Sequence, residues 1–389
     1  MSAAPIKVAS VCRVLPTPAN PAQGVFVHNR LDGMAGYMDV QRVQPVPFFP
    51  LLRPLPAWVD EAADVLRVPM FYLPGIFKEY DGRWMERAIF PVLARLQEER
   101  GLDVIDAHFG YPEAVACVNV ARRLGVKVLV TIRGLEEDYV RHAKIAPQLI
   151  QSVTAADGVI CVSQSLAKLM SSVGVPPARI HVVHNAIDRT RFFPGSRAAA
   201  RSELKLSEST PMVFSAARIV PGKRHTQLIE AFARLRQHHS DARLFIAGAT
   251  DDDPGYTDTT RKLIQTLNLD ASVTLLGSLD PTSIARYYQA ADVFGLMTAR
   301  EGCCNAVLEA LACGLATVTT DAGDNAVFVK NGVNGQIVAV DDVEGCATAM
   351  ARFIDSPLDR DGISRSLELG TWSEIGATLT GVFQQALAP

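Results

Sequence analysis

The sequence predicts an α/β protein built from two doubly wound parallel-sheet domains. Two series of short, Val/Ile-rich apolar runs alternate with amphipathic helical patterns, and a break near residues 185–199 separates the series. Continuous apolar runs are typical of parallel strands that helices cover on both faces. Regular alternation of strands and helices indicates right-handed crossovers in an open sheet. A chain of 389 residues is also too long for one ordinary core.

Ten apolar runs are predicted as strands, five on each side of the break. They are 7–12, 104–108, 126–132, 158–163, 180–185, 212–217, 243–248, 273–277, 292–297 and 315–320. Helices are predicted at 25–36, 82–101, 112–125, 163–174, 226–239, 281–291 and 371–388.

Pro194 and Gly195 follow the first series and indicate a hinge. We therefore expect domains at residues 1–190 and 191–370. Ligands of such sheets bind beyond the carboxyl ends of the strands. The expected place for chemistry is thus a central cleft between the two domains.

One segment of the first half does not fit the alternation. Residues 44–82 are rich in proline and large apolar side chains. The favoured interpretation is an irregular excursion packed on the first domain. The alternative is a surface that binds a hydrophobic acceptor or a lipid bilayer. The helix predicted at 82–101 places Arg83, Arg87 and Arg95 away from its apolar face, so it either covers the sheet or binds an interface.

Composition and charge narrow the functional classes. The formal net charge of −3 argues against wholesale nucleic-acid binding, which needs a basic face. Seven cysteines occur without a C-x-x-C pair or a Cys/His spacing suited to zinc. The first residues lack the apolar core of a secretion signal, and no run reaches the roughly 18 apolar residues of a spanning helix. We expect a cytoplasmic protein, with the inner face of the membrane as a possible peripheral location.

Two glutamates of the second half stand eight positions apart. Glu301 follows the strand predicted at 292–297, and Glu309 lies in the helix that Gly314 ends. A helix start offers free N–H groups and partial positive charge to a phosphate. Carboxylates that flank such a site can accept hydrogen bonds from hydroxyl-rich groups. The pattern therefore favours binding of a nucleotide-linked sugar.

A second element follows the strand predicted at 212–217. Arg218 ends that strand, and Lys223 comes five residues later in a Pro-Gly loop before a helix. Two cations that converge on one position can stabilise a leaving diphosphate. The alternative is a solvated loop that contains Arg218, Lys223, Arg224 and His225. The loop is not a Walker A motif.

The first half offers three further candidates. His108 closes a predicted strand, where it could bond a sugar hydroxyl or a phosphate or could simply be structural. Gly24 precedes the helix predicted at 25–36, where a glycine lets the backbone approach a phosphate. Arg133 ends another strand on the acceptor side, and the acids at 136–138 are interpreted as a helix start rather than a metal site.

With these motifs in place, the chain resembles the retaining glycosyltransferases of GT-B fold, family 4 (glycosyltransferase group 1). The segments that carry the resemblance are VICVSQSLAKLM, VVHNAIDRTRFFP, SAARIVPGKRHTQLIEAF and EGCCNAVLEALACGLATVTTDAG. QGVFVHNR, AHFGYPEAVA and TIRG are similar to members that build teichuronic acid or exopolysaccharide glycans. The resemblance implies two Rossmann-like domains and a terminal helix, 371–388, that crosses back to the first.

The resemblance also implies a role for each candidate residue. Arg218 and Lys223 would hold the donor diphosphate, Glu301 the donor sugar and Glu309 the ribose. His108 would lie beside the transferred sugar, and Gly24 would border the diphosphate. The backbone near sugar and phosphate would come from Gly302, Cys303, Cys304 and Asn305. The donor would be a nucleoside-diphosphate sugar and the acceptor a glycan or lipid-linked hydroxyl, with no metal or other cofactor.

Three departures from the family pattern bear on donor identity. Ala217 replaces a usual glycine, and Cys303–Asn305 replace a segment that often holds proline. The family often has a glutamate three positions after the glycine of the next loop, whereas here the acid, Asp324, follows Gly323 directly. Three rival functions stay open. They are a nucleotide-dependent oxidoreductase, a two-lobed solute-binding protein, and a non-catalytic sugar-nucleotide sensor.

Overall fold

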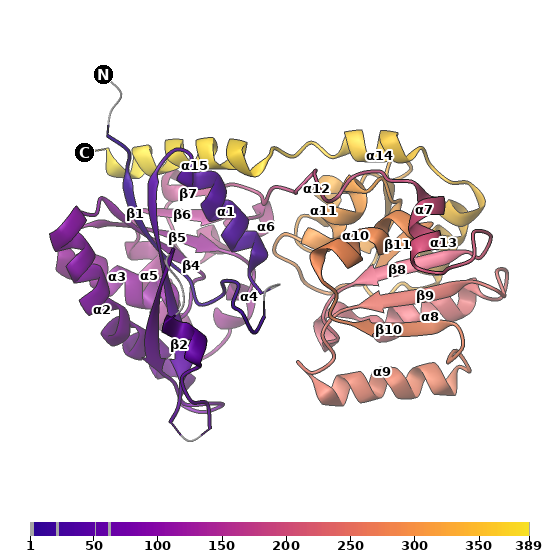
Figure 1. The fold of residues 1–389 in the computed structure, drawn as a ribbon, viewed down its shortest axis with the longest axis horizontal. Helices are drawn as coiled ribbons and strands as arrows, with labels where there is room; N and C mark the ends of the chain where they lie inside the picture. Colours follow the sequence, from indigo (N-terminus) through magenta and orange to yellow (C-terminus); the bar gives the residue numbers. More distant parts are fainter. Residues whose placement is uncertain (1–3, 21–22, 51, 61–63, 389) are drawn as a thin grey trace. The chain divides into compact units, whose positions relative to one another are not determined.

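The structure, a computed structural model, describes residues 4–20, 23–50, 52–60 and 64–388. The chain forms two compact units, one of residues 1–186 and 370–389 and the other of residues 187–369. Each unit contains one parallel sheet with helices around it (Figure 1). The predicted α/β class with two parallel-sheet domains is confirmed.

The first unit contains a seven-stranded sheet in the order β3-β2-β1-β4-β5-β6-β7. Its strands are β1 (Lys7–Val11), β2 (Asp39–Phe48), β3 (Val65–Phe71), β4 (Val104–His108), β5 (Lys127–Ile132), β6 (Gly158–Cys161) and β7 (Ile180–Val182). Its α-helices are α1 (Val25–Ala35), α2 (Asp81–Arg100), α3 (Glu113–Leu124), α4 (Glu136–Tyr139), α5 (Ala146–Ala155), α6 (Gln164–Ser172) and α15 (Trp372–Leu387). Short 3₁₀ turns occur at η1 (Ala57–Asp60), η2 (Lys78–Tyr80) and η3 (Pro177–Arg179).

The expected irregular excursion at 44–82 is wrong where β2 and β3 form. The carbonyl of Val43 accepts a hydrogen bond from the N–H of Cys12, the residue after β1, so Val43 and every second residue from it along β2 face the β1 side. Pro45 and Pro47 share that side, but β1 pairs with β2 only as far as Val43. Their missing N–H groups therefore cost no ladder bond. Pro69 is tolerated for a related reason, since β3 is the edge strand.

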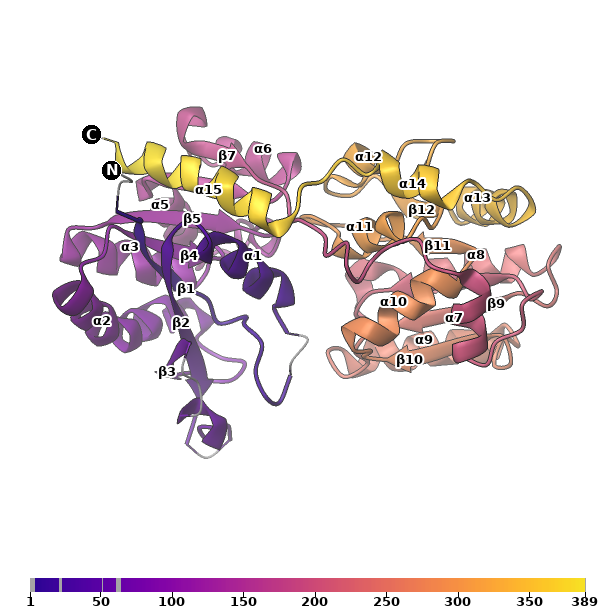
Figure 2. The ribbon, with the colours of Figure 1, turned by 45° about the horizontal axis from the view of Figure 1, so that its top comes forward.

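The terminal helix α15 packs against α1 within the first unit (Figure 2). Two glycines permit the close approach. A Cβ on Gly33 would lie 2.1 Å from the carbonyl oxygen of Trp372, and a Cβ on Gly376 would lie 2.1 Å from that of Gly33. Thr371 caps α15, because its side chain and that of Glu374 bond each other's backbone N–H groups. The helix is therefore an integral part of the first unit.

The second unit contains a six-stranded sheet in the order β10-β9-β8-β11-β12-β13. Its strands are β8 (Met212–Ala216), β9 (Arg243–Ala247), β10 (Val273–Gly277), β11 (Val293–Leu296), β12 (Thr317–Thr320) and β13 (Gly335–Val338). Its helices are α7 (Arg197–Glu203), η4 (Pro221–Lys223), α8 (His225–Leu235), α9 (Pro254–Thr266), α10 (Pro281–Ala290), α11 (Asn305–Ala312), α12 (Asn325–Phe328), α13 (Val343–Asp355) and α14 (Arg360–Ser366).

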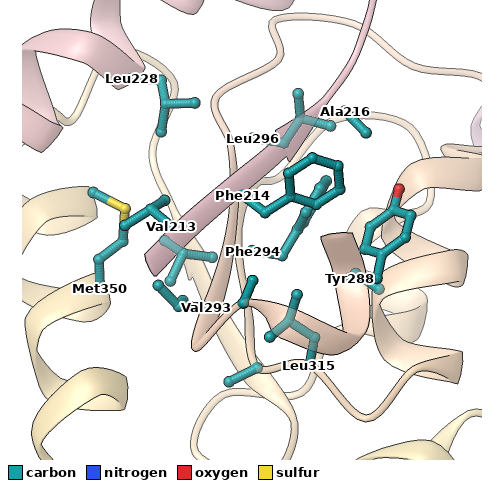
Figure 3. Packing of buried hydrophobic residues seen from close by; sticks show 14 of the residues in the cluster. Val213, Phe214, Ala216, Leu228, Tyr288, Val293, Phe294, Leu296, Leu315 and Met350 are labelled. Carbon is teal, nitrogen blue, oxygen red and sulfur yellow. The ribbon is translucent and has the colours of Figure 1, made fainter. Parts of the chain in front are cut away.

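Aromatic side chains fill the core beside the central strands of the second unit (Figure 3). The rings of Phe214, on β8, and Tyr288, on α10, meet edge to face with their centroids 4.9 Å apart. Phe294, on β11, packs against both rings. These contacts fix α10 against β8 and β11, and they hold Tyr288 in one orientation.

In the described part of the chain, no helix combines the length and the apolar character that crossing a bilayer requires.

Candidate active site

The geometry centres on two loops at the carboxyl end of the second sheet. Strands β8 and β11 are neighbours, so the loops that follow them meet. Lys223 in η4 and Glu301 after β11 form an ion pair with Nζ 2.5 Å from Oε1. Ala299 donates its N–H to the carbonyl of Gly222 at 2.9 Å, and Thr298 donates its hydroxyl to the same oxygen. The ion pair and the two hydrogen bonds therefore join the loop after β8 to the loop after β11.

A third loop, which follows β12, packs against the backbone of Glu301. Gly323 follows β12 with φ +60°, in the left-handed region that favours glycine. A Cβ at this position would lie 2.4 Å from the carbonyl oxygen of Glu301 and 2.7 Å from that of Gly302. The backbone under Glu301 therefore depends on a residue without a side chain at position 323.

Arg218 lies at the start of the same loop as Lys223 but has a different partner. Its Nη1 is 3.2 Å from Oδ2 of Asp252, and the side chain is 62% exposed. Asp252 is exposed, yet it is the carboxylate that Arg218 contacts. No pattern in the sequence indicates this pairing.

His225 was grouped with a solvated loop in the alternative interpretation, and for this residue that interpretation is wrong. The side chain is fully buried, and Nε2 is 3.0 Å from the carbonyl oxygen of Arg218. Burial, followed by the nearby Lys223 charge, lowers the pKa of His225 to about 4. The neutral imidazole therefore donates Nε2–H to Arg218 and fixes the backbone from which that side chain extends.

Glu309 lies in α11 with a tyrosine beside its carboxylate. Tyr288 donates its hydroxyl to Oε2 of Glu309 at 3.0 Å. Burial raises the pKa of Glu309 to about 7, although the Tyr288 hydrogen bond acts in the opposite direction. Among the described residues, no donor is hydrogen-bonded to Oε1 of Glu309, which suits the expected contact with ribose hydroxyls. That role stays a prediction.

The segment from Gly302 to Asn305 leads from Glu301 into the first turn of α11. Gly302 and Cys304 are buried, and Cys304 is the residue before the helix. Burial raises the pKa of the Cys304 thiol well above its usual value. Cys304 is therefore protonated at neutral pH, and Cys303 is half-buried. The predicted order of acid, short loop and helix is present.

In the first unit, the buried His108 and the half-buried Arg133 lie in contact with each other. Nε2 of His108 is 2.8 Å from Oδ2 of Asp106, and Nδ1 is 3.1 Å from Nη2 of Arg133. His108 is 0% exposed. Burial lowers the pKa of His108 to about 4, although Asp106 raises it. These contacts assign the neutral tautomer with the proton on Nε2.

This arrangement bears on the predicted role of His108 beside the transferred sugar. Both ring nitrogens are used within the first unit, by Asp106 and Arg133. Arg133 also donates to Oδ1 of Asn185 at 3.3 Å and lies over the ring of Phe26. Sequence reasoning missed Asp106, although it stands two positions before His108 in the same strand. The sugar contact stays a prediction.

Gly24 is the residue before α1 and has φ +65°. A Cβ there would lie 2.0 Å from the carbonyl oxygen of Val14. Close packing against the Val14 backbone therefore accounts for this glycine without a ligand, and the predicted phosphate contact is not tested by it.

The acids at 136–138 open a helix, as expected. Glu136 is buried at the start of α4 and accepts three backbone N–H groups, from Gly110 at 2.7 Å, Gly134 at 2.8 Å and Arg133 at 3.1 Å. Its carboxylate fixes the turn that carries Arg133. Among the described residues, no group of three or more His, Cys, Asp or Glu side chains is arranged to hold a metal ion.

Comparison with known families gives matches to both halves of the chain. The model described as Glycosyl transferases group 1 matches residues 196–366, which include the Lys223 and Glu301 loops. The model described as Glycosyltransferase Family 4 matches residues 42–191.

Two kinds of curated relative are similar to the chain. The N-acetyl-alpha-D-glucosaminyl L-malate synthase of Bacillus anthracis is 25% identical over 72% of this chain and 73% of its own length. The D-inositol 3-phosphate glycosyltransferase of Rhodococcus jostii is 31% identical over 53% of this chain. The chain spans about half the length of that second relative, with 47% of it aligned.

Solved structures share the fold at low identity. Sucrose-phosphate synthase from Thermosynechococcus elongatus superposes with a TM-score of 0.76 at 18% identity, over 98% of both chains. HepE from Anabaena, solved in complex with UDP and glucose, has a TM-score of 0.69 at 18% identity over 98% of both chains.

Proposed function

The chain belongs to the GT-B glycosyltransferases of group 1 and family 4, and from this premise we propose that it moves a sugar from a nucleoside-diphosphate sugar to a hydroxyl acceptor with retention of configuration. The observation that carries the proposal is the contact between Lys223 and Glu301 at the carboxyl end of the sheet. A cation held in this way suits a group that becomes negative during the reaction. The rival oxidoreductase and solute-binding functions do not fit this family.

The chemistry needs charge stabilisation at the leaving group. The bond between the anomeric carbon and the diphosphate oxygen breaks, and a bond to the acceptor oxygen forms on the same face of the sugar. The acceptor proton passes to an oxygen of the departing diphosphate. Lys223 and Arg218 neutralise the charge that develops there. Binding of the diphosphate replaces Asp252 beside Arg218, an exchange that costs little because both side chains are exposed.

Glu301 has two tasks in this scheme. Its Oε1 holds the Lys223 ammonium, which keeps two further N–H groups for phosphate oxygens. Its remaining acceptor capacity serves hydroxyls of the donor sugar. Glu309 accepts the ribose hydroxyls through Oε1. The N-terminus of α11, which begins at Asn305, adds partial positive charge for the diphosphate.

The identities of donor and acceptor are part of the proposal. HepE was solved with UDP, so a uridine diphosphate sugar is the first donor to test. The names of the relatives include malate and inositol 3-phosphate, both of which offer a hydroxyl beside an anionic group. Synthesis of a cell-envelope or exopolysaccharide glycan is the proposed setting, on the resemblance of the first unit.

A thermal-shift panel followed by a transfer assay tests the proposal. UDP, GDP and ADP are compared with their glucose and N-acetylglucosamine derivatives. A specific ligand at about 100 times its dissociation constant adds roughly 2.7 kcal/mol of stability. Transfer from the stabilising donor is then followed with malate, inositol 3-phosphate and envelope glycans. The anomeric proton coupling of the product reports retention, and an inverted product or the absence of any donor shift would contradict the proposal.

A further inference from the structure

Exposed apolar side chains are concentrated in one short stretch of the first unit. Twelve large hydrophobic residues are exposed among the described residues, and six of them lie between positions 52 and 80. These six are Leu52, Leu55, Phe71, Ile76, Phe77 and Tyr80. Ile76 and Phe77 are more than half exposed, at 56% and 54%. Contiguous exposed apolar surface on a folded protein usually marks an interaction site.

Ring contacts join the aromatic side chains of this stretch into one chain. The ring centroids of Phe77 and Tyr80 lie 6.3 Å apart, and those of Tyr80 and Trp84 lie 6.2 Å apart. The Trp84 ring meets that of Phe71 edge to face at 5.3 Å. Phe71 in turn lies 5.8 Å from Phe49. The chain of rings runs from the loop before α2, across the first turn of α2, to the edge strand β3 and the end of β2.

Cations surround these rings. Arg83 and Arg87 are exposed on α2, three and seven positions after Tyr80, so they share its side of the helix. The Arg83 guanidinium lies 6.0 Å from the centre of the Tyr80 ring. Lys78 is exposed beside Phe77. Arg53 is exposed at the other end, where its backbone pairs with Phe49.

The described acidic side chains near the rings either form ion pairs with other residues or are buried. Glu79 pairs with Lys144 at 2.6 Å, and Glu86 pairs with Arg123. Asp81 is 5% exposed. Asp64 is exposed but pairs with Arg42. Within the described residues, by contrast, Arg53, Lys78, Arg83 and Arg87 form no ion pair, so the face carries a local positive charge on a chain whose formal charge is −3.

We propose that this aromatic–basic face, the exposed surface of Phe71, Ile76, Phe77, Tyr80, Arg83 and Arg87, docks on a bilayer that contains anionic lipid. Trp and Tyr rings favour the level of the lipid headgroups, where one end is apolar and the other is wet. Cations around them attract anionic headgroups. The excess of cations around the rings favours an anionic lipid surface over a protein partner, because each Lys or Arg near such a surface adds about 1 kcal/mol of attraction.

The backbone conformation of residues 75–77 agrees with the exposure of Ile76 and Phe77. Phe77 has φ +55°, which is unusual for a bulky residue, and Gly75 has φ +79°. The loop thereby holds Ile76 and Phe77 outward instead of folding them onto the sheet. Such conformations persist at sites where the exposed side chain has a use. The inference goes beyond the proposed transfer reaction and does not depend on it, since docking is measured without turnover.

Cosedimentation of the full chain with vesicles tests the proposal. Vesicles of phosphatidylcholine alone are compared with vesicles that also contain phosphatidylglycerol. We expect binding to the anionic vesicles that weakens as salt rises from about 0.1 M to about 1 M, since the Debye length falls from ~10 to ~3 Å. Arg83→Glu with Arg87→Glu is expected to reduce the partition coefficient at least about tenfold. Ile76→Ser with Phe77→Asn is expected to reduce it by a similar factor, and Asn suits the φ of position 77.

Matched variants on the second unit provide controls. Arg261→Glu with Lys262→Glu reverses two neighbouring exposed cations on α9, and Val333→Ser with Val340→Ser removes two exposed apolar side chains. Both controls are expected to bind vesicles like the wild type. Equal binding to both kinds of vesicle, or equal loss in the controls, would overturn the proposal. Failure to bind vesicles would also overturn it, as would a dimer that Phe77→Asn converts to a monomer without affecting lipid binding.

Discussion

Lys223 and Glu301 stand 78 positions apart in the sequence, yet they form a 2.5 Å ion pair across two loops of the second unit. Glu301 is 8% exposed and Lys223 is 21% exposed. The pair therefore lies at the boundary between the protein and solvent. Glu301 holds the Lys223 ammonium in place, while part of the Lys223 side chain stays exposed to solvent.

Removal of the Lys223 charge tests the proposed diphosphate contact. Lys223→Met retains the length of the side chain but loses the ammonium, so we expect kcat to fall about 10²–10³-fold, as for loss of a main charge stabiliser. Arg224→Asn is the matched control, because Arg224 points to Asp341 instead and Asn suits its left-handed backbone. Steady-state kinetics with the donor that stabilises the protein provide the measurement.

The double variant Lys223→Met with Glu301→Gln separates the two tasks of Glu301. If the acid acts chiefly by holding the lysine, the double variant has about the same kcat as Lys223→Met alone. A further large loss would mean that Glu301 contributes mainly through the sugar. Turnover near wild type in Lys223→Met would remove the assignment altogether.

Gly323→Ala is expected to disturb the site through the backbone. The new methyl group would meet the carbonyl oxygens of Glu301 and Gly302, and φ +60° disfavours alanine. We expect a loss of more than about 1 kcal/mol in unfolding free energy and a lower kcat. Gly222→Ala has no heavy atom within 4 Å of the added carbon. Its stability should stay within about 0.5 kcal/mol, as urea denaturation can establish.

Donor binding should depend on pH through Glu309. Because burial raises its pKa to about 7, the carboxylate is about one-tenth ionised at pH 6 and about nine-tenths ionised at pH 8. The ionised form accepts ribose hydroxyls more strongly. Nucleotide affinity from calorimetry should therefore improve up to about tenfold over this interval. Glu309→Gln should remove that part of the change, and an unchanged profile would exclude Glu309 from the contact.

His225 should contribute to stability in a defined pH window. Its folded pKa of about 4 lies below the ordinary value of 6.5. The unfolded chain therefore takes up this proton first, and stability is lost as pH falls from about 6.5 to about 4. The acids Asp81 and Glu309, whose folded pKa values are raised, shift stability in the opposite direction. A difference between variants is therefore the suitable measurement.

His225→Gln retains a donor for the Arg218 carbonyl but does not titrate. The difference in unfolding free energy, wild type minus variant, should fall by up to ~1.4 kcal/mol per pH unit in this window. A difference that stays constant between pH 6.5 and pH 4 would contradict the buried, neutral state of the imidazole.

Much of the fold could be predicted from the sequence, because its strands are short apolar runs between clear helices. All ten predicted strands are present, from β1 at Lys7–Val11 to β12 at Thr317–Thr320. Strands β2 and β3 were missed because prolines break their pattern. The prolines are tolerated only because of their register, which sequence does not reveal. Strand β13 (Gly335–Val338) was missed because it is a four-residue edge strand with a polar side chain in the middle.

The candidate site was predicted less completely. Order along the chain sufficed to place Lys223 and Glu301 on loops at the same edge of the sheet, since β8 and β11 follow the expected alternation. The order of residues along the chain did not reveal which side chains are buried. His108 and His225 both stand at ends of regular elements, where exposure was expected or left open, yet both are fully buried. The partners Asp252 and Tyr288 depend on side-chain directions that no spacing encodes.

The return of α15 to the first unit has a practical consequence for protein engineering. Residues 187–369 form an uninterrupted stretch, whereas the other unit needs two separate stretches of chain, 1–186 and 370–389. A chimera that exchanges the second unit should therefore replace only residues 187–369 and retain the native residues 370–389. Truncation before Trp372 would strip α1 of its covering helix, and the exposed groove around Gly33 would favour aggregation.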